Sequence, residues 1–339
     1  MRKHILLLLI NTFLISALFA SEKPKVVVTT TIIKDITMQI AGDLVEVESL
    51  VPTGGDPHLY EPIPQDAIKI VKANLILMNG LTLEGWLNEF IENSGTKATV
   101  INTTKGVDPI VSDQYANSPD PHAWMDASNG IIYAENIKNA LIALNAENTA
   151  TYESNFEAFK TRIEALDIRL KELILTIPAD KRVLVTSHDA FKYYGRKYGL
   201  QLESILGTST DAQAQTQDIN RLYRVIKETG IPAIFVESTI NPRTLRQIAK
   251  DTKVKIGGTL YADSLGAPDG EAGTYEKMLL TNTETIVNAL TGKVNLEEID
   301  NSDETDGSGY SPISITLIII LLFGGAALLF LPMLLNKKK

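Results

Sequence analysis

The segment NAENTATYESNFEAFKTRIEALDIRLKELILT, residues 145–176, contains neither glycine nor proline. Its apolar side chains recur at helical spacing: Phe156, Phe159, Ile163, Leu166, Leu170, Leu173 and Leu175. About thirty residues of helix span roughly 45 Å, which is the length of a two-lobed protein. A coiled coil would show similar spacing, but no partner segment is evident. We therefore expect one long rigid helix, residues 145–177, that joins two lobes.

On both sides of this segment, short apolar runs alternate with amphipathic stretches. The strand-like runs before it are VVVTT (26–30), VEVESLV (45–51), NLILMNG (74–80) and ATVIN (98–102). Those after it are RVLVTS (182–187), LQLESIL (200–206), AIFVES (233–238) and KVKIGGTL (253–260). Strands that alternate with helices favour parallel sheets with helical crossovers. The sequence therefore predicts an α/β protein whose lobes, residues 21–144 and 178–293, are each a mainly parallel sheet flanked by helices.

Both ends of the chain have targeting features. Residues 1–20 combine a basic head with an apolar run that ends at small residues, as in a secretory signal peptide, although a retained N-terminal anchor is the alternative. Residues 313–335 contain no charge and are long enough to cross a bilayer as one helix. The basic tail 336–339 should then stay in the cytoplasm. Residues 294–312, which include six acids in 297–312 and Gly-Ser-Gly, read as a flexible tether. We expect an extracytoplasmic body anchored by a C-terminal transmembrane helix.

The charge balance and the lack of cysteine exclude several classes of site and partner. The 339 residues have a formal net charge of -9, which argues against nucleic acid or an anionic membrane surface as a partner. The chain has no cysteine, so disulfides, thiolate metal sites and a lipid-modified N-terminal cysteine are excluded. An acidic body is compatible with collecting cations.

The histidines are few and placed alike. Of four in the chain, His4 lies in the predicted signal peptide, and the others are His58, His122 and His188. Each of these three lies in a loop or at a strand end, where open α/β sheets bind ligands. Asp263 occupies an equivalent place after the run 253–260. Three imidazoles and one carboxylate suit a divalent metal of borderline to hard character, whereas a lone histidine is by default a satisfied surface or core residue.

Two of the histidines follow the same dipeptide, in Asp56-Pro57-His58 and Asp120-Pro121-His122. Proline fixes its own φ and keeps the preceding residue extended, so it stiffens the loop that aims the imidazole. The aspartate can accept a hydrogen bond from a backbone amide of the turn or from the ring nitrogen that does not bind metal. The sequence leaves both roles open for Asp56 and Asp120.

Several stretches, in order, resemble the metal-binding subunits of bacterial ABC importers, the TroA/ZnuA/PsaA-like solute-binding proteins (cluster A-I). They include VPTGGDPHLYEPIPQDAIKI, DPHAWMDASNG, VTSHDAFKYYGRKYGL and LYADSLG, and the resemblance extends from about Val26 to Leu290. It implies two α/β lobes joined by one long helix, with metal in the cleft. By motif, it implies that His58 and His122 are ligands from the N-terminal lobe and that His188 and Asp263 are ligands from the C-terminal lobe.

The resemblance also implies a function. We expect a monomer, not an enzyme, that captures a divalent metal and delivers it to an ABC permease. Relatives that look manganese-directed tend to have glutamate at the position of His188, and a third imidazole favours Zn²⁺. The region 104–120 lacks the histidine-rich loop of many zinc-directed relatives, so Mn²⁺ or mixed supply stays the alternative. A zinc hydrolase and a surface adhesin are more distant alternatives. Glu203 and Glu237 are expected to lie beyond the ligands or in solvent.

Overall fold

The computed structural model describes residues 22–111, 118–211 and 214–293. The predicted signal peptide, acidic tether, transmembrane segment 313–335 and basic tail all lie outside these residues. Within the described ranges, no helix is both long and apolar enough to cross a membrane.

The N-terminal lobe is built on a four-stranded sheet. Its strands are β1 (Lys25–Val28), β2 (Glu46–Ser49), β3 (Leu75–Met78) and β4 (Thr99–Asn102). They lie in the order β2-β1-β3-β4, and each neighbouring pair is parallel. Because adjacent parallel strands need a crossover, helices separate them in the sequence. The predicted parallel sheet of this lobe is confirmed.

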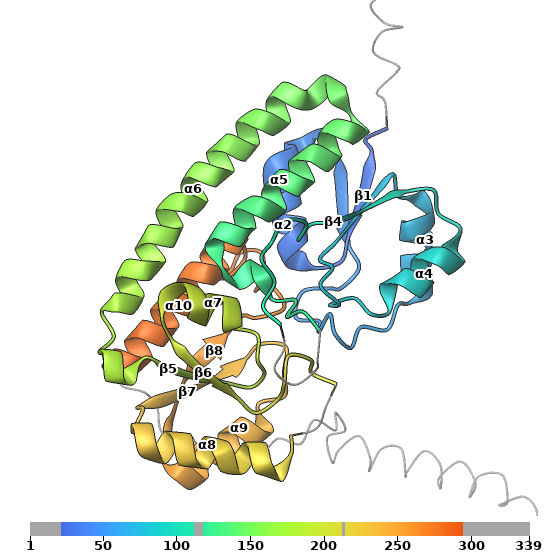
Figure 1. Cartoon of the computed structure of the whole chain (residues 1–339). Helices are drawn as coiled ribbons and strands as arrows, with labels where there is room; N and C mark the ends of the chain where they lie inside the picture. Colours follow the sequence, from blue (N-terminus) through green and yellow to red (C-terminus); the bar gives the residue numbers. More distant parts are fainter. Residues whose placement is uncertain (1–21, 112–117, 212–213, 294–339) are drawn as a thin grey trace, which may run out of the picture. The chain divides into compact units, whose positions relative to one another are not determined.

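Helices cover both faces of this sheet (Figure 1). They are α2 (Thr31–Ala41), α3 (Pro64–Lys72), α4 (Leu87–Ser94) and α5 (Ala127–Leu144). Alternate residues of β1 point to opposite faces, so Val26 and Val28 join the larger core, whereas Val27 joins a smaller one with Ile70 and Leu87. The apolar runs of β1 and β3 follow from burial on both sides, whereas the edge strands β2 and β4 are more exposed.

The C-terminal lobe contains two parallel pairs of strands. One pair is β5 (Val183–Thr186) with β6 (Gln201–Ser204), and the other is β7 (Ala233–Glu237) with β8 (Lys255–Leu260). We expected one continuous sheet here. The two ladders are instead separate, although β5 and β7 are neighbours in space, and the β7–β8 register shifts between Ile234 and Val236.

Four helices accompany these strands: α7 (Lys192–Tyr198), α8 (Thr216–Thr229), α9 (Arg243–Thr252) and α10 (Tyr275–Thr291). Helices α8 and α9 lie on one side of the strands and α10 on the other (Figure 1). Helix α10 also packs against α2 and α6, so it connects this lobe with the N-terminal one.

The long helix exists, but it starts later than predicted. Helix α6 spans Thr149–Leu175, about 40 Å at 1.5 Å per residue. The side chain of Asn145 accepts the backbone N–H of Glu147 and forms a 3-10 turn, Ala146–Asn148, before the helix begins. Helix α6 also has a partner that the sequence reading overlooked, because α5 packs along it. The helix is therefore braced by elements of both lobes.

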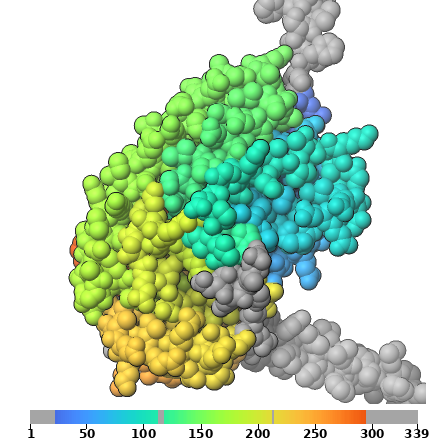
Figure 2. Space-filling view, in the orientation of Figure 1, coloured from blue at the N-terminus to red at the C-terminus, as the bar shows by residue number. Residues whose placement is uncertain are grey.

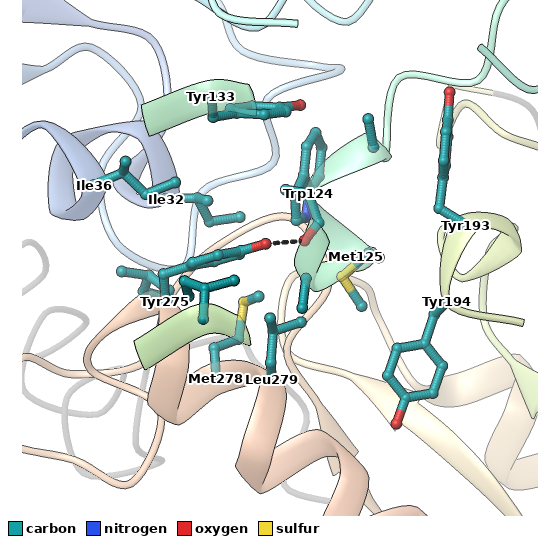
Figure 3. Close-up of a cluster of buried hydrophobic side chains, with 14 of the residues drawn as sticks. Ile32, Ile36, Trp124, Met125, Tyr133, Tyr193, Tyr194, Tyr275, Met278 and Leu279 are labelled. Carbon is teal, nitrogen blue, oxygen red and sulfur yellow. Dashed lines mark hydrogen bonds between the residues drawn. The ribbon is translucent and has the colours of Figure 1, made fainter. Parts of the chain in front are cut away.

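One buried apolar cluster extends through both lobes. Figure 3 shows its aromatic centre, where the hydroxyl of Tyr275 in α10 donates to the carbonyl of Trp124 at 2.6 Å. The ring of Tyr275 lies against Gly130 of α5, and a Cβ on Gly130 would come within 2.5 Å of that ring. Glycine is therefore needed inside this helix because a ring from the other lobe occupies the space of a side chain.

We predict that Gly130→Ala destabilises the protein although alanine favours helix. The added methyl forces α10 away from α5, at a cost of about 1–3 kcal/mol in the free energy of unfolding. The measurement is urea or thermal unfolding of both proteins. Gly85→Ala is the control, because its Cβ would meet no atom within 4 Å, and it should unfold like the unmodified protein. Equal stability of the Gly130 variant would contradict the close interlobe packing.

Candidate metal centre

The structure brings together the four residues singled out from the sequence. His58 lies in the loop after β2, and His122 directly precedes the 3-10 turn Ala123–Met125. His188 follows β5, and Asp263 follows β8. One nitrogen or oxygen atom from each of the four lies within 4.8 Å of the others. Two residues come from each lobe, so the cluster forms where the lobes meet.

The spacing of the ligand atoms fits a metal ion between them. Nε2 of His122 lies 3.2 Å from Nε2 of His58 and 3.3 Å from Nε2 of His188. The Asp263 oxygens lie 3.5 Å from His122 Nε2 and 3.3 Å from His188 Nε2. A tetrahedral zinc ion with ligands at about 2.0–2.1 Å requires about 3.3–3.4 Å between ligand atoms. His122 therefore stands near this spacing from the other three residues, and His188 from Asp263, while all four ligand atoms lie within 4.8 Å of one another.

Burial and neighbouring charges perturb every group of the cluster. Burial alone would lower the pKa of His122, but Asp120 and Asp263 outweigh it and raise the pKa to about 9. Glu237 and Asp263 likewise raise the pKa of His188 well above its usual range against the effect of burial. Although burial favours a neutral carboxyl, these two histidines hold the pKa of Asp263 well below its usual value. Burial lowers the pKa of His58 to about 3. Without metal, the cluster holds protons that a cation can replace.

The repeated Asp-Pro-His motif has one shared role and one that differs. In both copies, the aspartate accepts the backbone N–H of the histidine two residues later, at 2.8 Å for Asp56 and 2.9 Å for Asp120. Asp120 also contacts the ring Nδ1 of His122 at 2.8 Å. Asp56 instead accepts the hydroxyl of Thr210, a residue of the other lobe, at 2.6 Å. Both alternatives left open by the sequence therefore occur, but only Asp120 orients an imidazole ring.

The two glutamates considered from the sequence differ in what they contact. Glu237, at the end of β7, accepts the backbone N–H of His188 at 2.8 Å and approaches its Nδ1 at 2.6 Å. This contact fixes the ring so that Nε2 points into the cluster. Glu203 pairs with Arg221 at 2.7 Å. Only Glu237 therefore supports a member of the cluster.

Sequence reasoning missed the support of the His122 loop. Asn79, which follows β3, donates from its side chain to the carbonyl of Pro121 at 3.0 Å. The backbone around Asn79 is held by the buried carboxylate of Glu84, which accepts the N–H groups of Asn79 and Gly80. In the turn between Gly80 and Glu84, Leu81 has a φ of 50° and Thr82 a φ of 69°, which is a strained conformation for residues other than glycine. The Asn-Gly pair at the strand end was the available signal, since it is typical of a tight turn.

A cavity of about 520 Å³ adjoins the cluster. Its lining includes Asp56, Ser187 and Thr239, each close in sequence or space to one of the four residues. Thr239 donates a long hydrogen bond of 3.4 Å to Asp263. Trp124 does not line this cavity; its indole N–H donates to the carbonyl of Ala262 at 2.8 Å, which makes it an interlobe packing residue. The cavity therefore lies beside residues that neighbour the cluster.

Comparisons with known proteins show the family of this chain. The family described as "Zinc-uptake complex component A periplasmic" matches residues 26–289. The metal ABC transporter substrate-binding lipoprotein FimA of Streptococcus parasanguinis is 38% identical over 280 residues, which cover 80% of this chain and 90% of that protein. The iron-binding protein YfeA of Yersinia pestis is 38% identical and covers 78% of this chain and 86% of its own length.

Solved structures of periplasmic metal-binding proteins share the fold of this chain. The periplasmic zinc-binding protein TroA from Treponema pallidum superimposes with a TM-score of 0.76 at 31% identity, covering 79% of this chain and 99% of its own. A manganese-bound periplasmic metal-binding protein from Candidatus Liberibacter asiaticus gives a TM-score of 0.73 at 36% identity, covering 79% and 100%. The fold, the family match and the sequence relatives lead to the same conclusion. The protein belongs to the ZnuA/TroA/PsaA family of metal-binding substrate-binding proteins of ABC transporters.

Proposed function

We propose that this protein captures a divalent transition metal outside the cytoplasmic membrane through His58, His122, His188 and Asp263. The observation that supports this most directly is the meeting of their four ligand atoms within 4.8 Å of one another. The buried Oδ1 of Asp263 accepts no hydrogen bond from the described residues, as suits an oxygen directed at a cation. The chain is a transport component, not an enzyme, so the hydrolase alternative falls away.

Zinc is the metal that the ligand set favours. Three imidazoles make a softer site than two, and zinc binds such sites more tightly than manganese in the first-row order. The spacing near 3.3 Å between Nε2 of His188 and its neighbours His122 and Asp263 also suits ligands about 2.0–2.1 Å from a zinc ion. Some relatives are named for manganese and one for iron, so zinc is not the only metal bound in this family. Manganese is the alternative for this chain. In this proposal the metal is the transported substrate. Because all four ligands are protein atoms, no coordination position is left for a water molecule that could hydrolyse a substrate.

Delivery to a membrane permease is the step that follows capture. The relatives are named as ABC transporter subunits, so we propose that the loaded protein docks on a permease and releases the ion there. The interlobe core, α6 and α10 together limit how far the lobes can separate. We therefore propose that release needs only a small displacement of one lobe's ligand pair, because two ligands come from each lobe.

We also propose how the protein is held at the membrane. Its relatives include lipoproteins, but this chain has no cysteine to carry a lipid. The uncharged segment 313–335, followed by three lysines, fits a transmembrane helix that anchors the exported body. The acidic stretch before it then serves as a tether.

The first test is a titration of the chelator-stripped full chain with Zn²⁺ and Mn²⁺ by calorimetry. We expect one zinc per chain that excess manganese does not displace. His188→Ala should lower the zinc affinity because it removes a ligand. Tight manganese binding at the same site would transfer the function to manganese or mixed supply. If neither metal binds, the ligand assignment is wrong.

A matched pair of variants tests the role of Glu237. Glu237→Gln should lower zinc affinity by about 10- to 100-fold, because the His188 ring loses its charged orienting partner. Glu203→Gln is the control, since its carboxylate pairs with Arg221 instead, and its affinity should match that of the unmodified chain. Equal losses in both variants would show that Glu237 acts only through general stability or charge.

Metal affinity should rise steeply with pH. His122 and His188 have raised pKa values without metal, so these rings hold protons more readily than free imidazole and must lose them at Nε2 to bind the ion. His58 has a pKa of about 3 and contributes no proton at neutral pH. The loss of protons on binding predicts that zinc affinity rises as the pH rises towards about 9, the pKa of His122. Calorimetry in buffers of different ionisation enthalpy counts these protons; none released between pH 6 and 8 would contradict the assignment.

A further inference from the structure

The outward side of α8 and α9 presents a group of exposed cations. Arg243, Arg246 and Lys250 follow one another at helical spacing along one side of α9, and Lys253 caps its C-terminus. The neighbouring helix α8 adds Arg224 and Lys227. Among the described residues, none forms an ion pair with any of these six side chains. We call these six residues the basic face; in Figure 2, residues 216–255 form the yellow to orange lower surface.

Part of this arrangement is unfavourable for helix α9. Cations one turn apart repel each other. Arg243 lies in the first turn of α9, where the positive end of the helix dipole disfavours a cation. The helix is held by its opposite side, through Leu245, Ile248 and Ala249. Lys227, Lys250 and Lys253 lie at helix C-termini, where the dipole favours a cation. The repulsion between neighbouring cations is not offset by an ion pair among the described residues, and an external anion would offset it.

The basic face is a local exception to the charge of the chain. Residues 216–255 contain eight lysines and arginines against four acids, one of which is the buried Glu237. The whole chain has 32 lysines and arginines against 41 acids. The net charge of -9, which argued against an anionic membrane surface as partner, is thus an average that conceals a segregated positive region.

The composition of the basic face favours a headgroup surface over a protein partner. Protein interfaces have a core of apolar and aromatic side chains. The exposed large hydrophobic residues of the described chain all lie outside α8 and α9. A layer of lipid phosphates needs only accessible positive charge, which attracts it over about a Debye length.

The proposed anchor follows the described C-terminal lobe in the sequence after a short tether. The C-terminal lobe continues past α10 into the predicted tether 294–312 and the proposed anchor. That tether spans at most about 65 Å when extended. Anchoring keeps the lobe at a high effective concentration beside the bilayer, so weak electrostatic contacts suffice.

We propose that the basic face binds the anionic phospholipid headgroups of the membrane in which the chain is anchored. This contact turns α8 and α9 towards the bilayer and orients the metal-binding cleft for the permease. The inference rests on the proposed anchor, but not on the identity of the metal.

Fluorescence transfer in lipid nanodiscs tests the orientation. The full chain with Gln247→Cys carries a donor dye on α9, and its label is unique because the chain has no cysteine. The discs contain phosphatidylglycerol or phosphatidylcholine, with an acceptor dye on a headgroup. We expect more transfer in phosphatidylglycerol discs, and we expect the increase to vanish between 0.1 M and 1 M NaCl as the Debye length falls from about 10 Å to about 3 Å.

Two charge-matched variants show whether the basic face is responsible. Arg243→Gln, Arg246→Gln, Lys250→Gln and Lys253→Gln together should abolish the increase in phosphatidylglycerol discs and leave zinc affinity unchanged. The control replaces four exposed lysines elsewhere, Lys72, Lys97, Lys105 and Lys171, with glutamine and should keep the increase. Equal transfer in both lipids, or equal loss in both variants, would overturn the proposal.

Failure of the anchor gives a separate signal. If the chain does not co-elute with the discs, the anchor proposal is wrong, and the basic face is then judged by co-sedimentation with phosphatidylglycerol vesicles. Salt-sensitive co-sedimentation that the four α9 substitutions abolish supports the lipid contact. Its absence, or equal binding by the variant, overturns it.

Discussion

The packing of the two lobes against each other is the constraint on which the metal centre depends. His58 and His122 come from one lobe and His188 and Asp263 from the other, and one ligand atom from each lies within 4.8 Å of the others. A shift of one ångström between the lobes would disperse them. The shared core, with the ring of Tyr275 against Gly130 and its hydroxyl on the carbonyl of Trp124, holds the lobes in this relation.

Rigidity extends from this core to the ligands through hydrogen bonds to carboxylates and amides. Asp120 and Glu237 each hold both the backbone N–H and the ring of a histidine. Asn79, in a turn held by Glu84, supports the loop of His122 through its hydrogen bond to the carbonyl of Pro121. His58 lacks a ring partner of this kind among the described residues, since Asp56 bonds Thr210 across the lobe boundary instead. His58 is also the most exposed of the four.

Capture and anchoring make different demands on the same chain. The centre gathers negative charge to hold a cation, whereas α8 and α9 gather positive charge at the surface. The two charged regions are separate, because the cluster is buried where the lobes meet and the basic face is exposed. A protein whose average charge is negative can in this way attract metal and still lie against an anionic bilayer.

The sequence by itself determined the α/β class, the alternation of strands and helices, the long helix and all four members of the cluster, because strand periodicity, helix breakers and rare histidines at loop edges are local signals. It did not reveal α5 as the partner of α6, the separation of β5–β6 from β7–β8, or the later start of α6 after Asn145. Nor could it choose between Glu203 and Glu237, or between the two roles of each Asp-Pro aspartate. Those choices belong to tertiary structure, because each depends on which side chain from a distant segment arrives at the site: Thr210 at Asp56, Arg221 at Glu203 and His188 at Glu237.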